Sequence, residues 1–323
     1  MQKDIKNFIQ QFNFQPSLEN PNDQLSQFQK FIVAGMGGSH LAADLIKDVS
    51  SPSSLIIHSN YELPALGTEE LSDYLFIASS YSGNTEETLD ALQAAQKNKM
   101  AIAVISAGGK LLEIAQKENL PYIQLPSGDI QPRLAVGYSL IAMLTLMRHS
   151  QGLKEVREMD SSLFGENLTE SGQSLAQEIT EHGLIPLIYS TKQYPSLTYL
   201  WKINLNETGK IPTFSNVFPE LNHNEMQGFE ILTRNHLYEK FLIIMLRDPA
   251  DHPANLKRME LTRKIYEDLG LKVTFSELKG KNYWEKVLSS VNLSQWTSFH
   301  IAQNYGVEPE QVNLVEKFKK MLK

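Results

Sequence analysis

The chain has 323 residues, of which 41% are hydrophobic and 21% are charged, and its formal net charge is −7. This composition excludes disordered and fibrous proteins, and the acidic balance argues against nucleic-acid binding, for which a basic excess is typical. The sequence contains no cysteine, which excludes disulfides and thiolate metal sites and fits a reducing cytoplasm. A chain of this length is long enough for two domains.

No segment of the sequence has the pattern of a membrane or secretory element. Residues 1–12 are polar and amphipathic and lack the apolar core of a signal peptide. The longest nearly uncharged stretch, 134–147, is too short to span a bilayer and predicts a buried helix. We therefore expect a soluble, cytoplasmic protein that binds neither membrane nor nucleic acid.

The first half alternates short β-rich runs with longer helical patterns. Strands are predicted at 31–34, 55–57, 74–78, 101–105 and 122–123, with helices such as 40–49 and 86–98 between them. This alternation predicts a parallel sheet with helices on both faces.

After the buried helix, the polar segment 151–172 is the predicted connection between two domains, 1–150 and 173–323. The α/β pattern then restarts, with strands at 185–189, 241–246 and 273–275 and a basic amphipathic helix at 312–323. The prediction is an α/β protein made of two α/β/α sandwiches, each with a mainly parallel central sheet.

The junction after the third predicted strand suggests an anion site. Ser79, Ser80, Ser82 and Thr85 offer four hydroxyls around Gly83, just before a helix begins. Hydroxyls and the free N–H groups of a helix N-terminus can hold an anion with several oxygens, most plausibly a phosphate. The loop contains no Lys or Arg, so the donors would be neutral. The alternative is an ordinary N-cap, but one cap needs only one hydroxyl.

The first strand is followed by a glycine-rich turn, Gly35 to Ser39. It is not a dinucleotide fingerprint, because His40 stands where that motif has its third glycine, and it is not a Walker loop. Since ligands bind at the carboxyl ends of parallel strands, this turn and the serine loop are expected to face one ligand. A turn that needs glycine for its geometry alone is the alternative.

The second half has a polar cluster in apolar surroundings between residues 201 and 229. It contains Glu207, Glu220, Asn222, His223, Asn224 and Glu225. A carboxylate whose pKa is raised by partial burial, together with a histidine, suits proton transfer. For Asn222, Asn224 and Glu225, a structural role in a polar loop is as well supported as a functional one. A metal site is disfavoured, because one histidine with scattered carboxylates is a poor ligand set.

Two further basic features carry less weight. Arg133 begins the predicted buried helix and could direct its guanidinium at a ligand oxygen, with a surface ion pair as the alternative. The terminal lysines Lys317, Lys319 and Lys320 fit a solvated basic face that favours the helix C-terminus.

Five motifs together resemble a known family. They are GMGGS at 35–39, SYSGNTEET at 80–88, PRLAVGY at 132–138, NE at 206–207 and PELNHNE at 219–225. In this order, over nearly the whole chain, they resemble the SIS (sugar isomerase) domain proteins. More narrowly, they resemble the bifunctional phosphoglucose/phosphomannose isomerases of archaea and bacteria, and PELNHNE is the most specific of the five.

The resemblance implies a role for each matching residue. Gly38, Ser39, Ser80, Ser82 and Thr85 would hold the phosphate of the sugar. Glu207 would carry a proton between C1 and C2, and Arg133 would stabilise the enediolate. His223 would assist ring opening and would reach the site of the partner subunit in a homodimer. The family's C-terminal lysine falls at Lys319, with Lys317 and Lys320 as alternatives.

The implied reaction interconverts an aldose 6-phosphate with fructose 6-phosphate and requires no metal or organic cofactor. Glucose and mannose 6-phosphates share one enediolate, so a single base can serve both. A non-catalytic phosphosugar-binding regulator is the competing hypothesis, and an aminosugar-phosphate isomerase or deglycase is another. Glutamine-dependent amination is excluded, because no glutaminase domain with a nucleophilic cysteine is attached.

Overall fold

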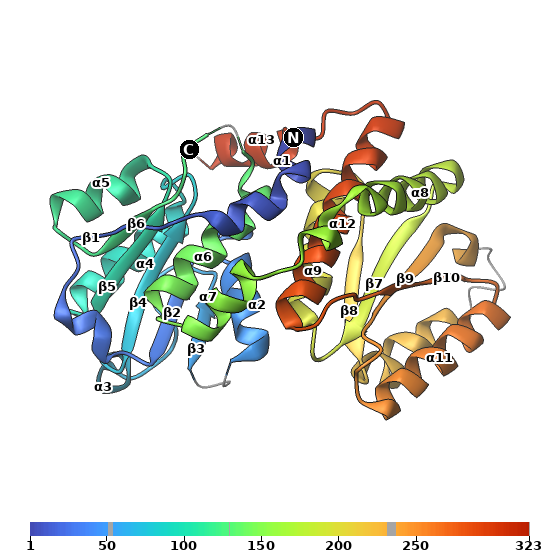
Figure 1. The fold of residues 1–323 in the computed structure, drawn as a ribbon, viewed down its shortest axis with the longest axis horizontal. Coiled ribbons are helices and arrows are strands. Elements are labelled where there is room, and N and C mark those ends of the chain that lie inside the picture. Colours follow the sequence, from blue (N-terminus) through green and yellow to red (C-terminus); the bar gives the residue numbers. More distant parts are fainter. Residues whose placement is uncertain (51–53, 129, 231–236, 323) are drawn as a thin grey trace. The chain divides into compact units, whose positions relative to one another are not determined.

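The computed structural model describes residues 1–50, 54–128, 130–230 and 237–322. They form two compact units, which we call the N-terminal unit (Asn7–Met159) and the C-terminal unit (Met1–Lys6 with Asp160–Lys323) (Figure 1). The first six residues join the C-terminal unit because Ile5 is buried there and its carbonyl accepts a 3.0 Å hydrogen bond from Asn292 Nδ2.

The N-terminal unit contains a six-stranded sheet in the order β1-β6-β5-β4-β2-β3. Its strands are β1 (Leu18–Glu19), β2 (Lys30–Ala34), β3 (Leu55–His58), β4 (Tyr74–Ser80), β5 (Ala101–Ser106) and β6 (Tyr122–Gln124). All neighbours are parallel except β1, which pairs antiparallel with β6. Every residue of the central strand β4 is buried, as expected for a strand covered on both faces.

Helices cover both faces of this sheet (Figure 1). They are α2 (Leu41–Val49), α4 (Glu86–Lys97), α5 (Gly109–Lys117) and α6 (Val136–Leu146). Because side chains alternate between the two faces of a strand, Phe76 and Ala78 of β4 pack on the same side, in one cluster with Leu92 of α4 and Leu111 of α5. Helix α6 is the buried helix predicted from the sequence. In the described part of the chain, no helix has the length and apolar character that a membrane span requires.

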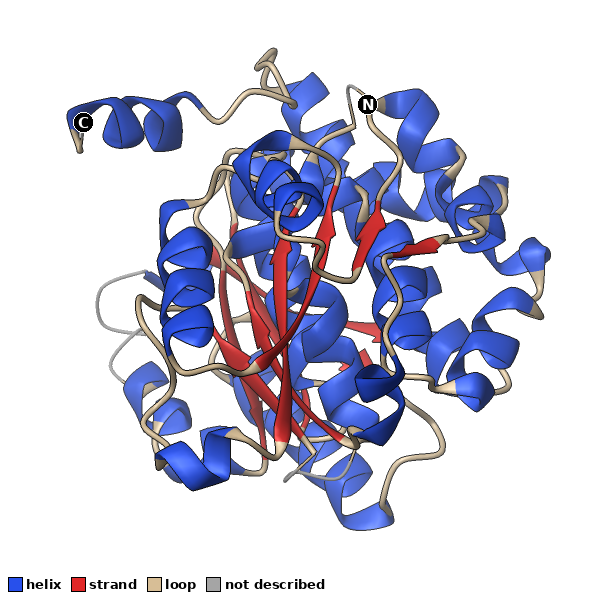
Figure 2. Cartoon of the chain, turned by 90° about the vertical axis from the view of Figure 1, so that its left-hand side faces the viewer, coloured by secondary structure: helices blue, strands red, loops and turns tan. Residues whose placement is uncertain are grey.

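The C-terminal unit contains a four-stranded, all-parallel sheet in the order β10-β9-β7-β8. Its strands are β7 (Ile185–Thr191), β8 (Phe214–Phe218), β9 (Phe241–Arg247) and β10 (Lys272–Glu277), and its main helices are α8 (Glu166–His182), α9 (Pro195–Glu207), α11 (Pro253–Asp268) and α12 (Tyr283–Asn304). Met259 and Tyr266 of α11 pack with Tyr189 of β7 and Met245 of β9 in one apolar cluster. Figure 2 draws the strands of the chain in red and its helices in blue.

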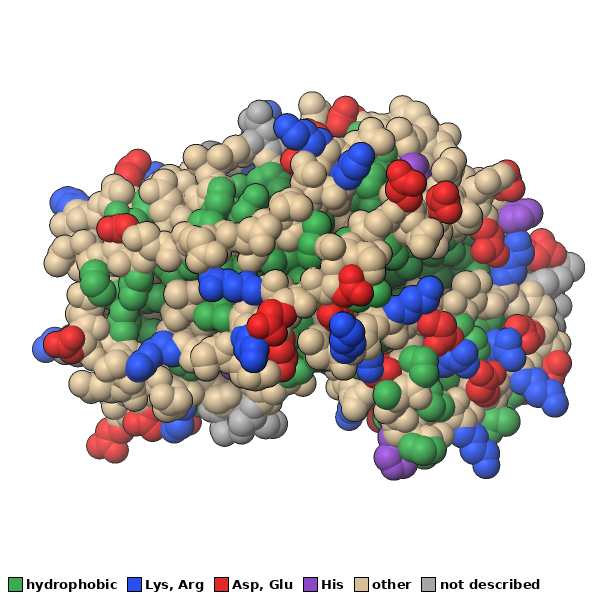
Figure 3. Space-filling view, viewed as in Figure 1, with side chains coloured by type: hydrophobic (Ala, Val, Ile, Leu, Met, Phe, Trp, Pro, Cys, Tyr) green, Lys and Arg blue, Asp and Glu red, His purple; other side chains and the backbone are tan. Residues whose placement is uncertain are grey.

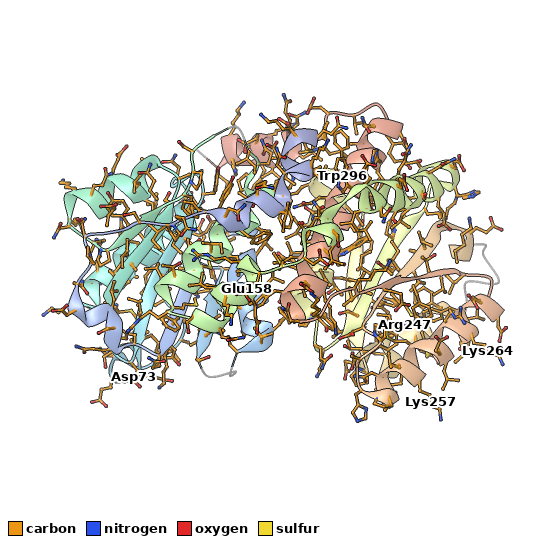
Figure 4. The ribbon with its side chains drawn as sticks, in the orientation of Figure 1. Asp73, Glu158, Arg247, Lys257, Lys264 and Trp296 are labelled. Carbon is orange, nitrogen blue, oxygen red and sulfur yellow. The ribbon has the colours of Figure 1, made fainter. Side chains whose placement is uncertain are left out.

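Helices α8 and α12 pack closely, because α8 has a glycine at their contact. A Cβ on Gly172 would lie 2.7 Å from Cβ of Trp296 on α12, the tryptophan labelled in Figure 4. On the other side of the unit, Arg247 at the end of β9 lies 4.0 Å from the ring centroid of Phe275 and bonds Glu277, both on β10. Arg247 therefore links the last two strands of the sheet.

The shorter elements connect these layers. They are α1 (Gln2–Lys6), η1 (Phe8–Asn13), η2 (Asp23–Gln27), η3 (Gly37–Ser39), α3 (Thr68–Leu71), η4 (Pro132–Leu134), α7 (Ser150–Arg157), η5 (Ser161–Phe164), η6 (Glu220–His223), η7 (Glu225–Phe229), η8 (Leu237–Lys240) and α13 (Asn313–Met321). Acidic and basic side chains are intermixed on the face drawn in Figure 3.

The predicted fold class, two parallel-sheet α/β units, is confirmed. All eight predicted strands are present, and the structure adds β1 and β8. The segment 151–172, which we interpreted as a connection, is largely helical, because it contains most of α7 and the first turns of α8. The predicted C-terminal helix is α13, and Lys323 at its predicted end lies outside the described residues.

Candidate functional site

The two loops predicted to face one ligand lie side by side in the N-terminal unit. From β2 the sheet continues to β3 on one side and to β4 on the other, so a topological switch point lies between β2 and β4. There the Ser79 hydroxyl donates to the Ser39 carbonyl (2.7 Å), and the Tyr81 N–H donates to Ser39 Oγ (3.0 Å). Ser79 and Tyr81 thus tie the serine loop to the glycine-rich turn.

Inside the serine loop, hydroxyls bond one another and the backbone. Ser80 Oγ lies 2.9 Å from Thr85 Oγ1 and accepts a 3.1 Å bond from the Gly83 N–H. Ser80 is 1% exposed, whereas Ser82 is exposed and Thr85 half-buried. Thr85 is the N-cap residue of α4 but makes no side-chain capping bond. Its hydroxyl therefore does not have the role that the ordinary N-cap interpretation requires.

Gly83 is required by both backbone conformation and space. Its φ is +68°, and a Cβ there would lie 1.7 Å from the Gly108 carbonyl oxygen. Ser106, at the end of β5, supports the loop from the same side by donating to the Ser80 carbonyl (2.7 Å). Ser106 was not among the site residues predicted from the sequence. Its position at the end of the strand next to β4 was the available signal.

Arg133 also belongs to this cluster. A Cβ on Gly38 would lie 2.9 Å from the carbonyl carbon of Pro132 and 3.0 Å from the Arg133 amide nitrogen, so only glycine lets η4 approach the turn this closely. Arg133 is 2% exposed, which excludes the surface ion pair considered as its alternative. The structure thus gathers Gly38, Ser39, Ser80, Ser82, Thr85 and Arg133 at one end of the N-terminal sheet.

His40 follows Ser39 directly and is accommodated by a specific partner. Its Nδ1 lies 2.6 Å from Oδ2 of Asp44, one turn further along α2. The imidazole is buried, with 7% of the residue exposed. The histidine therefore fits into the first turn of α2 by pairing with a carboxylate of the same helix.

The equivalent switch point of the C-terminal sheet, between β7 and β9, is occupied by carboxylates. Asp248 accepts bonds from Lys286 Nζ (2.8 Å) and the Tyr194 hydroxyl, and Asp251 accepts one from Thr191. Both aspartates are 5% exposed. A second phosphate would be repelled here, so the two sheets are not equivalent as anion sites.

Glu207 is the last residue of α9 and lies in the C-terminal unit. Helix α9 begins just after β7 and runs back along the sheet, so Glu207 comes near the amino ends of the strands. Asn204, one turn earlier, is fully buried and donates to Ser294 Oγ of α12 (2.7 Å). This bond fixes the end of α9, and Glu207 itself is half-buried.

His223 lies at the other end of the same sheet. It ends η6, which follows the carboxyl end of β8, and it is exposed. Helix α9 has 13 residues, or about 20 Å at 1.5 Å per residue. Within one chain, the structure therefore does not bring Glu207 and His223 together.

The neighbours of His223 bond to strands β7 and β8, to helix α11 and to one another. Glu225 accepts bonds from the hydroxyl of Tyr189 and the amide of Asn216, and Asn222 donates to Thr262 Oγ1 (2.8 Å). Burial, with the nearby carboxylate, raises the pKa of Tyr189 above its ordinary value, so the hydroxyl remains a donor. Asn224 donates to Glu220 (3.0 Å). These bonds support the structural explanation for Asn222, Asn224 and Glu225.

Lys319 lies on α13, of which no described residue is buried. Its ammonium pairs with Glu316 at 2.9 Å, one turn earlier. Lys317 and Lys320 are exposed on the same helix, so burial does not distinguish between the three lysines. Among the residues that the structure describes, no three His, Asp or Glu side chains form a group that could bind a metal ion.

The two parallel-sheet units and the hydroxyl loop at a switch point define an SIS-domain protein. A family profile described as "Bacterial phospho-glucose isomerase C-terminal SIS domain" matches residues 169–322. A solved structure of a hypothetical protein from Thermus thermophilus has the same fold, with a TM-score of 0.71 and 15% identity over 99% of this chain and 87% of that one.

Two curated relatives narrow the assignment, and both are called bifunctional phosphoglucose/phosphomannose isomerase. The Aquifex aeolicus protein is 30% identical over 99% of this chain and 98% of its own. The Caldicellulosiruptor bescii protein is 32% identical over 93% of this chain and 91% of its own. The chain belongs to the bifunctional phosphoglucose/phosphomannose isomerase family, which confirms the resemblance found in its motifs.

Proposed function

We propose that this protein interconverts glucose 6-phosphate and mannose 6-phosphate with fructose 6-phosphate through a cis-enediolate. The observation that carries the proposal is the hydroxyl loop at the switch point of the N-terminal sheet, with Thr85 bonded to Ser80 rather than capping α4. The names of the relatives support the choice of substrate. A cytoplasmic location remains a prediction from the sequence.

The phosphate is held by neutral donors and by the N-terminus of α4. Ser82 and Thr85, which are accessible, contact it directly. Ser39 and Ser80, which are buried and bonded to the loop backbone, hold the two loops in the shape that receives it. The phosphate fixes the sugar, and this orientation contributes to the rate.

Ring opening comes first, since the cyclic sugar has no free carbonyl at C1. A donor protonates the ring oxygen while O1 loses its proton, and His223 and Lys319 are the candidates. Glu207 then removes the proton from C2, which forms the cis-enediolate, and returns it to C1, while the proton on O2 passes to O1 and the carbonyl forms at C2. A positioned base is worth about 10²- to 10⁴-fold, so the charge on the enediolate oxygens needs a partner as well.

Arg133 is that partner in this proposal. It is buried beside the glycine-rich turn, where a preorganised cation interacts strongly with a developing oxyanion. The two aldoses differ only in configuration at C2 and give the same enediolate, so Glu207 and Arg133 serve both.

We further propose a homodimer in which His223 completes the site of the partner subunit. The support is the sheet topology: Glu207 ends α9 near the amino ends of the strands, whereas His223 follows their carboxyl ends. One chain therefore cannot present both residues to one sugar, and a second copy supplies the missing histidine.

A coupled assay tests the reaction, with glucose 6-phosphate, mannose 6-phosphate and glucosamine 6-phosphate as substrates and Glu207→Gln as the variant. We expect the wild type to isomerise the first two sugars, and the variant to lose at least about 100-fold in kcat with little change in KM. A variant as active as the wild type would show that another residue is the base. Binding without turnover of any sugar would favour the regulator, and turnover of the aminosugar alone would favour an aminosugar-phosphate enzyme.

Mixed subunits test the shared site. Glu207→Gln and His223→Ala homodimers each have two damaged sites, but a mixed dimer has one intact site if His223 crosses the interface. After unfolding and refolding an equal mixture, we expect about a quarter of wild-type activity, because half of the dimers are mixed and each has one working site of two. Activity no higher than in the separate variants would contradict the shared site.

A further inference from the structure

We propose that Lys210 is a positioning residue that fastens the segment preceding α13 to the corner of the fold that carries Glu207. This inference rests on the proposed function, in which Glu207 is the base and Lys319 of α13 is a proton donor. Lys210 itself contacts neither sugar nor phosphate in the proposal, and acts through the backbone of these two segments.

The ammonium of Lys210 donates to two backbone carbonyls from distant parts of the sequence. One belongs to Glu207, the last residue of α9, and the other to Gln311, two residues before α13 begins. The last carbonyls of a helix lack intrahelical partners and carry partial negative charge, so a cation at this end is favourable. One charged group thus joins the end of α9 to the start of the C-terminal segment.

The backbone after Glu207 turns so that the side chain of Lys210 returns to the C-terminal end of α9. Lys210 has a φ of +58°, a left-handed conformation that costs a non-glycine residue about 1 kcal/mol or more and persists only where the surroundings impose it. Gly209 lets the turn close, since a Cβ there would lie 2.8 Å from the Leu205 carbonyl oxygen. The Ile211 N–H donates to that same carbonyl at 3.3 Å, which completes the turn.

The segment before α13 has a second anchor in the same unit. Glu310 Oε1 accepts a 2.6 Å bond from the N-terminal ammonium of Met1. Residues 310 and 311 are therefore tied at two points, whereas every described residue of α13 beyond them is exposed. Residues 310–311 are therefore the fixed end of the C-terminal segment, and the exposed helix α13 follows them.

Helix α13 carries Lys319 eight residues after the anchored carbonyl of Gln311. A nine-residue helix spans about 13 Å, so a small change in direction at its base moves the ammonium of Lys319 by several ångströms. A catalytic donor misplaced by about 1 Å can cost 100-fold in rate. The bond between residues 310–311 and the end of α9 thus fixes the position of the proton donor, Lys319, relative to the base, Glu207. The phosphate loop belongs to the N-terminal unit, so phosphate binding does not depend on this bond.

The test compares Lys210→Met, which keeps the aliphatic chain but cannot donate, with Lys210→Arg, which can. Lys202→Met is the matched control, because Lys202 lies on α9 as well but its ammonium lies over the ring of Tyr199. We expect Lys210→Met to lower kcat about tenfold with KM changed less than about twofold. Lys210→Arg should recover most of kcat, and the control should match the wild type. A rise in KM with kcat unchanged would contradict the positioning role of Lys210. So would a fall in kcat that is as large for Lys210→Arg as for Lys210→Met.

A double variant tests whether Lys210 acts through α13. If it does, the double variant Lys210→Met with Lys319→Met has the same kcat as Lys319→Met alone. Without the ammonium of Lys319, the loss of the Lys210 anchor has no donor to misplace. Losses that multiply would contradict the proposal.

Hydrogen exchange gives a measurement that does not depend on isomerase activity. We expect the amides of residues 316–321, which bond within α13, to exchange at least about tenfold faster in Lys210→Met than in the wild type, with those of the serine loop unchanged. Unchanged exchange at 316–321 would overturn the anchor. If the wild-type protein showed no isomerase activity, the proposed function would fail while the exchange result still decided whether Lys210 holds this segment.

Discussion

The hydroxyl oxygens of Ser80 and Thr85 lie 2.9 Å apart, across a loop that joins β4 to α4. The same Ser80 oxygen accepts the N–H of Gly83, so one buried side chain fixes both ends of the turn. Ser82, between them in the sequence, is exposed. Two serines only two residues apart thus have different environments, and this difference can be tested.

Substituting alanine for each serine separates the shape of the loop from its contact with phosphate. Ser80→Ala removes the partner of the Thr85 hydroxyl and one of the two acceptors of the Gly83 N–H, which keeps its 3.2 Å bond to the carbonyl of residue 80. We therefore expect the free energy of unfolding to fall by about 1–2 kcal/mol and KM to rise. Ser82→Ala should raise KM about tenfold or more, the value of one hydrogen bond to a charged group, with stability changed by less than about 0.5 kcal/mol. Urea denaturation and steady-state kinetics measure both. Equal stability of the two variants would contradict this assignment.

Gly83→Ala and Gly37→Ala form a matched pair for the same loop region. Both glycines have positive φ, +68° and +53°, but a Cβ would meet the Gly108 carbonyl oxygen at 1.7 Å in the first case and nothing within 4 Å in the second. We expect Gly83→Ala to lower the free energy of unfolding by about 2–4 kcal/mol, and Gly37→Ala by about 1 kcal/mol. Thermal and chemical unfolding would show the difference, and similar losses would mean that the loop relaxes around the new methyl group.

The affinity for sugar phosphate should depend only weakly on salt. The segment 79–85 has no Lys or Arg, and Arg133, the cation beside the turn, is buried, where screening by salt is weak. We expect KM for glucose 6-phosphate to change less than about threefold between about 0.05 M and 0.5 M KCl. A steep, continuous rise of KM would instead indicate exposed cations that bind the phosphate.

Lys286→Met should destabilise the protein at neutral pH and much less in acid. Burial raises the pKa of Asp248, but bonds from Lys286 and Tyr194 outweigh it, so its pKa lies below the ordinary value. A depressed pKa adds stability above the unfolded value, about 3.9, and this stability is lost as the pH falls through the folded pKa. Removing the ammonium leaves a buried carboxylate without its cation, which should cost about 3 kcal/mol. Protonating Asp248 removes that cost.

The check is chemical denaturation of Lys286→Met and wild type at about pH 7 and about pH 3. The difference in free energy of unfolding between wild type and Lys286→Met should become smaller as the pH falls. The control Lys281→Met removes a lysine whose charge acts on Asp160, and it should leave the free energy of unfolding close to that of the wild type at both pH values. A difference between wild type and Lys286→Met that stays constant with pH would contradict the proposed pairing.

The sequence predicted those parts of the fold that have a strong local pattern. β8 was missed because Phe214 to Phe218 contains Ser215 and Asn216 and forms an edge strand whose first residue is 56% exposed. β1 was missed because two residues are too short for any periodicity to show. The helical nature of 151–172 was hidden by its polar composition, since α7 and α8 bury only a narrow stripe.

For the site, the sequence predicted which loops meet, because parallel strands bring their carboxyl ends to one edge. It did not identify Ser106 or Lys210, whose roles depend on contacts between segments far apart in the chain. Nothing in the sequence indicated that Glu207 and His223 lie at opposite ends of the C-terminal sheet. That separation follows from the direction of α9, which only the order of the strands reveals.

The pairing of Ile5 with Asn292 bears on how the chain folds during synthesis. The first six residues leave the ribosome long before helix α12 is made, so their partner does not yet exist when Asn7–Met159 is already complete. Domains generally fold as units in the order of their translation. Residues 1–6 therefore join the C-terminal unit only after α12 has been made.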